Sequence, residues 1–354
     1  SGARMSSVDG SAPMHLPWNL RQISVTEGLL GEYAGEGITV GIIDSGVDIT
    51  HPALKDKWRG NTGDKAVSWF DTVGSETEPV DSTGHGTHVA GTILGSDPSG
   101  TGSLGVAPKA NFIAARVFDE NGDTSDSQLL KAMEWMLAPV DSNGVKHPEL
   151  APRVVNNSWG SSAANHLMRD ALKEWRSAGI LPVFSAGNQD LNNFGGSGSI
   201  SQPGSFPEAF AVGALRSDDV VARFSLRGPS RYTDQVKPDI SAPGVNIRSG
   251  WNKQTMKILT GTSMAAPHVT GVAALVLSAN PNLTVDKLEE ILRQSATPLT
   301  DAQHVEAPNH AYGAGKVNAA LAIDMAKVDS TIGTVQGKVY VRGVDAGAPV
   351  ITHN

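Results

Sequence analysis

Residues 37–46 of this 354-residue chain read Gly-Ile-Thr-Val-Gly-Ile-Ile-Asp-Ser-Gly. The first seven form a short run rich in apolar and β-branched side chains, which is typical of a strand buried on both faces of a parallel sheet. An aspartate, Asp44, follows directly, and Ser45 and Gly46 are turn-forming residues. The stretch therefore predicts a buried parallel strand with a carboxylate at its carboxyl end.

Further runs of this kind recur along the chain, at residues 112–117, 154–157, 181–185, 209–214 and 245–249. Helical patterns lie between several of them, at residues 85–94, 127–137, 165–178 and 263–279. Strands that alternate with helices imply right-handed βαβ crossovers, so we expect an α/β fold of three layers, with a mostly parallel central sheet and helices on both faces. Sites in such folds form beyond the carboxyl ends of the strands, where Asp44 and Asn188 should lie.

Composition limits the range of functions. The chain has 28 lysines and arginines against 36 aspartates and glutamates, and this net charge of −8 argues against nucleic acid or an anionic membrane as a partner. It has no run of eighteen apolar residues, so we expect no membrane span. It has no cysteine, which excludes disulfides, thiolate metal sites and a cysteine nucleophile.

Two other segments carry chemistry: residues 84–88, Gly-His-Gly-Thr-His, and residues 261–267, Gly-Thr-Ser-Met-Ala-Ala-Pro. With Asp44 they supply a carboxylate, an imidazole and a hydroxyl, the set that turns a serine into a nucleophile. Pro267 lacks an N–H and is tolerated near a helix start, so we expect a helix to begin near Ser263. The hydroxyl would then lie at the positive end of that helix.

Each of these residues also has an ordinary structural interpretation. Asp44 could be no more than a turn-forming residue, and His85 could be a packed core histidine. The occurrence of all three motifs in one chain, in the order aspartate, histidine, serine, favours catalysis. A metallohydrolase that uses His51, His85 and His88 is an alternative, although no zinc motif with a glutamate accompanies them. We expect His88 to be a packed, hydrogen-bonded neighbour, and His51 and His268 to be structural. An esterase is a further alternative, but the Gly-x-Ser-x-Gly elbow is absent.

Residues 41–46, 85–92 and 261–269 resemble the three signature blocks of the subtilisin-like serine proteases, or subtilases. The resemblance covers roughly residues 17–327, and within the family residues 15–20 are most similar to bacillopeptidase F-type secreted enzymes. It implies a serine endopeptidase with Asp44, His85 and Ser263 as its triad and an acyl-enzyme intermediate. Asn188 would donate to the oxyanion beside the Ser263 N–H. The related sedolisins have a glutamate in place of the histidine, and an inactive binding module would lack one of these four groups.

The resemblance also implies how a peptide binds. The substrate would add as a strand between residues 122–125 and 158–160, with a primary pocket walled by residues 158–160 and 186–188. The residues assigned to binding are Gly122, Asp123, Thr124, Ser125, Ser158, Trp159, Gly160, Ala186, Gly187 and Ser201. Small residues in the walls favour large uncharged side chains before the cut, within a broad specificity. Asp119, Glu120, Asp123 and Asp126 could make the rim acidic, or could simply be solvated.

Structural calcium is the one cofactor that the resemblance implies, and no organic cofactor is expected. The loop at residues 95–103 has only Asp97 as a carboxylate, and Ala53 stands where the family has an acid, so the strong family site is in doubt. A second pattern could hold a cation between Asp239 and the carbonyls of Pro207 and Ala209. The alternative for Asp239 is a buried carboxylate that accepts hydrogen bonds from main-chain amides.

We divide the chain into a tail or cleaved remnant at residues 1–16, a peptidase domain at 17–330 and a C-terminal extension at 331–354. Residues 334–341 alternate like a strand, the possible start of a truncated β-domain. The resemblance implies protein or peptide substrates, export from a bacterial cell, synthesis as a zymogen with an N-terminal pro-segment, and a monomer.

Overall fold

The computed structural model describes residues 16–98, 102–161 and 166–332. Within them, seven strands form one parallel sheet in the order β2-β3-β1-β4-β5-β6-β7. These strands are β1 (Thr39–Asp44), β2 (Trp69–Asp71), β3 (Asn111–Arg116), β4 (Val154–Asn157), β5 (Leu181–Ser185), β6 (Phe210–Leu215) and β7 (Ile240–Pro243). The expected α/β class with a parallel central sheet is confirmed.

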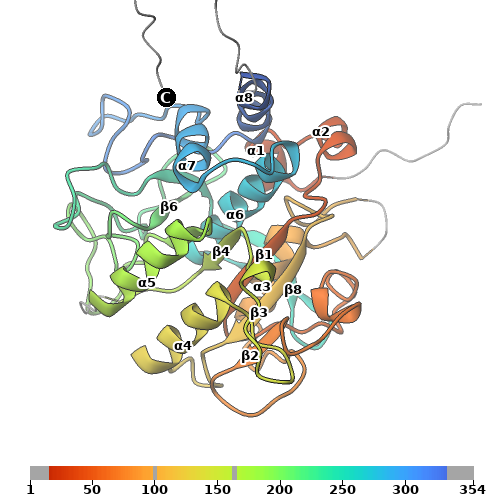
Figure 1. Ribbon diagram of the computed structural model, residues 1–354. Coiled ribbons are helices and arrows are strands. Elements are labelled where there is room, and N and C mark those ends of the chain that lie inside the picture. Colours follow the sequence, from red (N-terminus) through yellow and green to blue (C-terminus); the bar gives the residue numbers. More distant parts are fainter. Residues whose placement is uncertain (1–15, 99–101, 162–165, 333–354) are drawn as a thin grey trace, which may run out of the picture.

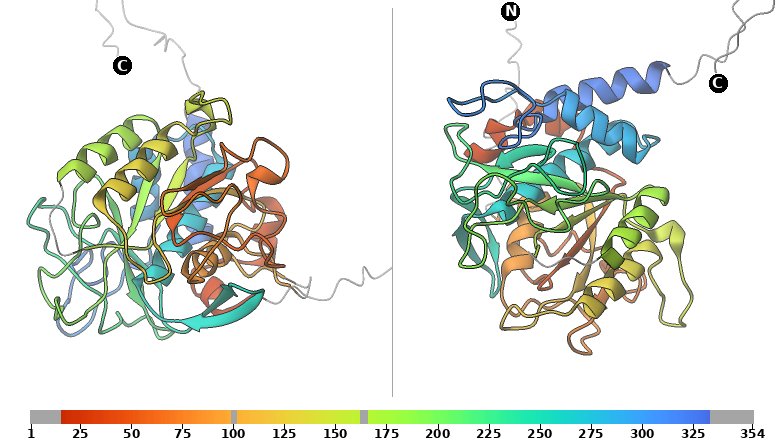
Figure 2. Two further views of the ribbon diagram at one scale, coloured as in Figure 1. Left: turned by 90° about the horizontal axis from the view of Figure 1, so that it is seen from below. Right: turned by 90° about the vertical axis from the view of Figure 1, so that its left-hand side faces the viewer.

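Helices cover both faces of the sheet (Figures 1 and 2). They are α1 (Trp18–Gln22), α2 (Glu27–Glu32), α3 (His85–Leu94), α4 (Asp126–Leu137), α5 (His166–Ser177), α6 (Thr262–Ala279), α7 (Val285–Gln294) and α8 (Ala319–Ile332). The helices α4 and α5 pack side by side on one face, away from α7 and α8. On the other face, α6 runs under β4 to β7 and contacts α3 and α8.

Alternate strand residues enter two different cores. Ile42 of β1 packs with α3 and α6, while the next residue, Ile43, packs with α4 and α5. Phe112 and Ile113 of β3 divide in the same way. This period of two is why each strand is apolar throughout.

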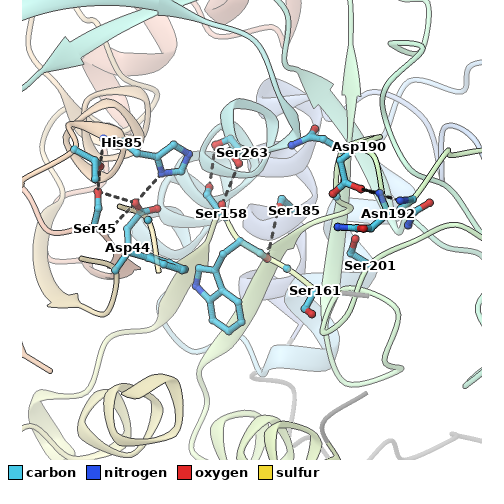
Figure 3. Close-up of a pocket in the computed structure, with 18 residues that line it drawn as sticks. Asp44, Ser45, His85, Ser158, Ser161, Ser185, Asp190, Asn192, Ser201 and Ser263 are labelled. Carbon is cyan, nitrogen blue, oxygen red and sulfur yellow. Dashed lines mark hydrogen bonds and ion pairs between the residues drawn. The ribbon is translucent and has the colours of Figure 1, made fainter. Parts of the chain in front are cut away.

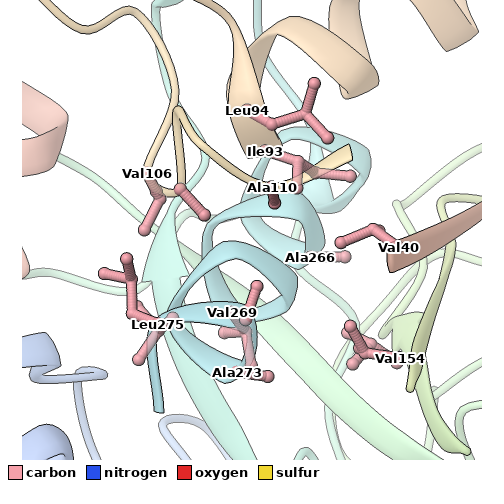
Figure 4. Close-up of a cluster of buried hydrophobic side chains, with 14 of the residues drawn as sticks. Val40, Ile93, Leu94, Val106, Ala110, Val154, Ala266, Val269, Ala273 and Leu275 are labelled. Carbon is pink, nitrogen blue, oxygen red and sulfur yellow. The ribbon is translucent and has the colours of Figure 1, made fainter. Parts of the chain in front are cut away.

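The helix α6 is the centre of the larger core (Figure 4). It is long and apolar enough to cross a membrane by composition, but 83% of it is buried inside the protein. Its apolar character is therefore explained by burial between the sheet, α3 and α8.

The segment at 245–249 differs from expectation. It does not join the central sheet; β8 (Ile247–Trp251) pairs with β9 (Thr255–Leu259) in an antiparallel hairpin against α3. The edge position belongs instead to β7, which pairs with β6. Arg248 is exposed while its neighbours are buried, so β8 is a half-buried strand rather than one covered on both faces.

Both ends of the chain fall largely outside the described residues, including residues 1–15 and the strand expected at 334–341. The last described helix, α8, ends at Ile332.

Candidate active site

A cleft of about 530 Å³ lies beyond the carboxyl ends of β1, β4 and β5 (Figure 3). Its walls include Asp44, His85, Ser158, Trp159, Gly160, Gly187, Asn188, Ser201 and Ser263. The two neighbouring strands β1 and β4 and the starts of α3 and α6 bring these residues together, as the parallel topology predicts.

Asp44 is the last residue of β1, and its side chain is 1% exposed. Its Oδ1 accepts hydrogen bonds from His85 Nδ1 at 2.7 Å and from the Ser45 N–H at 2.8 Å. Its Oδ2 is buried without a hydrogen-bond partner. Since Nδ1 carries the hydrogen that Asp44 accepts, the other ring nitrogen of His85, Nε2, is left to act as a base.

A second carboxylate, Asp81, organises the start of α3, where His85 is the first residue. Its Oδ1 accepts from Ser45 Oγ at 2.9 Å and from the Gly84 N–H at 2.8 Å. Its Oδ2 accepts from the N–H and the hydroxyl of Thr87, at 2.8 and 2.6 Å. Asp81 therefore satisfies amides that the first turn cannot pair. Sequence reasoning missed Asp81, although an acid just ahead of a helix start is a recognisable signal.

These carboxylates set the basicity of His85. Burial alone would lower the pKa of His85, but the charge and hydrogen bond of Asp44 and the charge of Asp81 outweigh it, so the pKa is raised above 6.5. The pKa of Asp81 is also raised, mainly by burial and in part by the nearby charge of Asp44. The side chain of His85 remains 33% exposed to the cleft.

The β8–β9 hairpin closes over the start of α3. Gly84 has a φ of +93°, and a Cβ there would lie 2.5 Å from the Trp251 indole. Only glycine permits both this backbone conformation and the contact. The Trp251 ring in turn lies under Lys257 Nζ, 3.7 Å from its centroid.

The neighbouring histidines hold this hairpin. His51 Nε2 donates to the Thr255 carbonyl at 2.8 Å, and His88 Nε2 lies 3.0 Å from the Ile247 carbonyl. Burial lowers the pKa of His88 to about 4, so its ring is neutral. Both rings are thus engaged with the main chain, as the structural interpretation expects, and the grouping of His51 and His88 with His85 that a metallohydrolase needs has no support here. Within the described ranges, no three His, Cys, Asp or Glu residues are arranged to hold a metal ion.

Ser263 is the second residue of α6 and exchanges hydrogen bonds with Ser158. Its Oγ donates to the Ser158 carbonyl at 3.0 Å, and Ser158 Oγ donates to the Ser263 carbonyl at 2.9 Å (Figure 3). Pro267 lies in the second turn of α6, not in the first as expected. Because proline has no N–H, the Ser263 carbonyl four residues earlier has no helical donor, and Ser158 supplies one.

The Ser263 hydroxyl donates to Ser158 in this conformation, and no hydrogen bond is described between Ser263 and His85. Hydrogen bonds between a nucleophile and its base are often unformed until substrate is bound. The Ser263 N–H is one of the first four amides of α6, which have no helical acceptor.

Asn188 lies in the cleft beside this amide. Its Oδ1 accepts from the N–H and the hydroxyl of Thr262, at 2.9 and 3.0 Å. Those bonds fix the orientation of the amide group and leave its Nδ2 donor group for the cleft. Thr262, which sequence reasoning did not single out, is thus the anchor of Asn188.

The other expected binding residues divide into three groups. Gly122, Ser158, Trp159, Gly160, Gly187 and Ser201 line the cleft. Thr124 and Ser125 line a second cavity that shares Trp159 and Gly160 with it. Asp123 and Ala186 line neither: Asp123 lies in the exposed turn, and the buried Ala186 carbonyl accepts from the Ser201 N–H at 3.0 Å.

Gly187 and Ser201, the expected wall and base of the primary pocket, are in close contact. Gly187 has a φ of +98°, and a Cβ there would lie 2.2 Å from Ser201 Oγ. A side chain at position 187 would therefore occupy the space next to Ser201, which is the expected base of the pocket.

The cleft also contains an acid that sequence reasoning missed. Asp190 lines it together with Asn192 and Asn193, whose N–H groups both donate to Asp190 Oδ1 at 2.7 Å. An aspartate two residues after Asn188 was the available signal. Of the four rim acids considered from the sequence, Asp119 accepts hydrogen bonds from main-chain amides of its own exposed turn, which lower its pKa.

At both positions where calcium was expected, groups of the protein itself form hydrogen bonds with the expected ligand residues. Ala53 is buried, and its carbonyl accepts from the Ser96 N–H at 3.0 Å, closing the base of the loop at 95–103. At the second position, the Lys237 ammonium donates to the Ala209 carbonyl at 2.5 Å and to Asp239 Oδ2 at 2.6 Å. Asp239 Oδ2 also accepts from the Ala211 N–H at 2.8 Å.

Comparison with known proteins identifies the family. Residues 35–315 match the subtilase family. Bacillopeptidase F of Bacillus subtilis (strain 168) is 48% identical over 344 residues, which are 95% of this chain and 24% of that protein. Serine protease AprX of the same strain is 36% identical over 313 residues, 80% of this chain and 66% of that protein. Subtilisin Savinase of Lederbergia lenta is 34% identical over 304 residues, 86% of this chain and 97% of that protein.

A parallel α/β sheet with an aspartate, a histidine and a serine at one edge defines a serine hydrolase site. The chain belongs to the subtilase family, the family of subtilisin-like serine proteases, so the expected resemblance is confirmed. It spans about a quarter of the length of the bacillopeptidase F that it matches.

Proposed function

We propose that this chain is an endopeptidase that cuts peptide bonds through Asp44, His85 and Ser263. The hydrogen bond of 2.7 Å between His85 Nδ1 and Asp44, in the cleft that Ser263 lines, carries the proposal. Ser263 Oγ attacks the peptide carbonyl carbon while His85 Nε2 takes its proton. The C–N bond then breaks as His85 returns the proton to the leaving amine. Water repeats the sequence on the acyl-enzyme and frees the acid.

The oxyanion formed at each attack needs two donors. The Ser263 N–H and the Asn188 Nδ2 group are suited to this role, since neither is used by the protein's own hydrogen bonds described above. The positive end of α6 adds to their effect.

The substrate is an extended peptide with broad sequence tolerance and a large uncharged side chain before the cut. The small residues Gly160, Gly187 and Ser201 support this size preference, because they leave room in the pocket. Asp190 supports tolerance of cationic side chains in the same place. A peptide library should give large apolar residues first and lysine or arginine second; strict selection of acidic residues would contradict the assignment. Asp190→Asn should lower turnover of lysine peptides about 2- to 5-fold relative to phenylalanine peptides, with Asp123→Asn as the control outside the cleft.

Labelling with a fluorophosphonate tests the catalytic assignment. The label should map to Ser263, and casein hydrolysis should stop with labelling but continue in strong chelators. His85→Ala should abolish both labelling and hydrolysis. Ser161→Ala, a change in another serine of the same cleft, should leave labelling in place. A label on a different serine, or hydrolysis that needs a metal, would contradict the proposal.

Family membership supports three further parts of this proposal: export to the outside of the cell, maturation from a zymogen by removal of a pro-segment, and a monomeric state. They complete the proposal of a secreted bacterial protease. Recovery of the activity from culture medium, rather than from cells, is the corresponding measurement.

A further inference from the structure

The side chain of Lys237 is fully buried, and both hydrogen-bond acceptors described for its ammonium group are oxygen atoms. It is 0% exposed, and it donates to the Ala209 carbonyl and to Asp239 Oδ2. A main-chain carbonyl and a carboxylate are the ligands that a hard cation such as calcium takes in proteins. The ammonium therefore has the surroundings of a bound metal ion.

Asp239 meets a second internal cation on its other side. Its Oδ1 accepts from Arg293 Nη1 at 3.1 Å, and its side chain is only 4% exposed. Arg293 also pairs with Glu289 at 3.4 Å, and Glu289 pairs with Arg176. One buried carboxylate is thus held between two side-chain cations, within an ion-pair network that links the start of β7 to α7 and α5.

We propose that Lys237 is a built-in substitute for a structural cation, and that this chain binds no metal ion at Asp239. The family implies calcium there, but the residues present do not fit a metal. An incoming ion would have to displace the ammonium, which would leave a buried charge without a partner. It would also lie beside Arg293, whose positive charge already pairs with the other oxygen of the carboxylate.

The Lys237 ammonium differs from a metal ion in being covalently part of the chain. A metal ion must be bound from solution and is lost to chelators, whereas the ammonium of Lys237 is delivered whenever the chain folds. The Ala209 loop and β7 therefore stay joined at any calcium concentration. The sequence signal is a lysine two residues before the aspartate, in Lys237-Pro238-Asp239.

Removal of the ammonium should convert the position into a metal site. Lys237→Ala is compared with the unchanged protein by thermal unfolding, in chelator and in millimolar calcium, with a serine-directed inhibitor present to prevent self-digestion. The variant should melt lower than the unchanged protein in chelator. Calcium should then raise its melting temperature by about 2 °C or more beyond any rise in the unchanged protein.

Lys316→Ala is the matched control. Lys316 Nζ also pairs with a carboxylate, that of Asp219, at 2.7 and 2.8 Å, and its side chain is 13% exposed. The hydrogen bonds described for the Lys316 ammonium include none to a main-chain carbonyl, so its removal should cost stability without creating a calcium response. An equal calcium response in Lys237→Ala and the unchanged protein would overturn the proposal.

A structural measurement on the unchanged protein covers the case in which Lys237→Ala does not fold. Crystals grown in millimolar calcium should contain the lysine nitrogen between Ala209 and Asp239. An ion within about 2.6 Å of those oxygens, with the lysine turned away, would overturn the proposal.

Discussion

Ser158 and Ser263 each donate a side-chain hydrogen bond to the other's main-chain carbonyl, at 2.9 and 3.0 Å. The pair joins the end of β4 to the start of α6. It satisfies the carbonyl that Pro267 leaves without a helical donor, and it holds the Ser263 hydroxyl within the cleft.

This exchange of hydrogen bonds predicts that the stability cost of removing the Ser158 hydroxyl depends on whether residue 267 is proline. Ser158→Ala leaves the Ser263 carbonyl without its donor, so the free energy of unfolding should fall by about 1–3 kcal/mol. In a Pro267→Ala background the helix regains an N–H for that carbonyl, and Ser158→Ala should cost less. Denaturant unfolding of the four proteins in the cycle measures the coupling. Equal costs in both backgrounds would show that the proline and the serine act independently.

Asp81 should contribute, after Asp44, to the pH at which the proposed activity appears. His85 must be neutral to act as a base, so kcat/KM rises as pH rises through its raised pKa, with a midpoint above 6.5. Asp81→Asn removes a negative charge that favours the imidazolium, so the pKa of His85 should fall and the midpoint should move to lower pH.

Asp71→Asn is the control for this shift. Asp71 also caps main-chain amides, those of Val73 and Gly74, but it pairs with Arg116 and has no hydrogen bond to the His85 network. It should alter stability without moving the midpoint. A loss of activity in Asp81→Asn at an unchanged midpoint would mean that Asp81 acts only through the fold.

Asn188→Ala should reduce kcat about 10²- to 10³-fold with little change in KM. This is the size reported for such a donor in subtilisin, which we carry over by family membership. Because Asn188 is also hydrogen-bonded to its anchor Thr262, Thr262→Val serves as the control: it removes one of the two bonds to Asn188 Oδ1 and keeps the Nδ2 donor. Comparable losses in both variants would assign the effect to positioning of α6.

The buried histidines predict sensitivity to acid. Burial lowers the pKa of both His88 and His268 to about 4, whereas in the unfolded chain it is about 6.5. The unfolded state therefore binds more protons between these values, and stability should fall as pH drops from 6.5 to 4, by at most about 3 kcal/mol for each ring.

His268→Gln should flatten this dependence, measured by denaturant unfolding of the inhibited protein at several pH values. His147→Gln is the control, because nearby carboxylates raise the pKa of the half-buried His147. A group whose pKa is raised on folding contributes its full stabilisation at every pH below 6.5. The variant should therefore leave the pH dependence of the free energy of unfolding between pH 4 and 6.5 unchanged. An unaltered slope in His268→Gln would contradict the buried-histidine account.

Local sequence determined the main elements of the fold. Residues 154–157 and 181–185 form strands with the predicted bounds, and the helix at 85–94 matches as well, because apolar β-branched runs and a glycine before the helix are local signals. The four-residue strand β7 was missed, since Ile240-Ser-Ala-Pro243 has no such run and becomes a strand only by pairing with β6.

The sequence alone also determined which residue types could form the site, because Asp44, His85 and Ser263 each lie at the end of a strand or the start of a helix. What only the tertiary structure decided is how these groups are partnered. Asp81 supports His85, Ser158 replaces the bond lost at Pro267, and Lys237 takes the position expected for a cation. Each of these contacts depends on side chains that folding brings within 3 Å, and no periodicity along the chain encodes which polar group a buried carboxylate or carbonyl will meet.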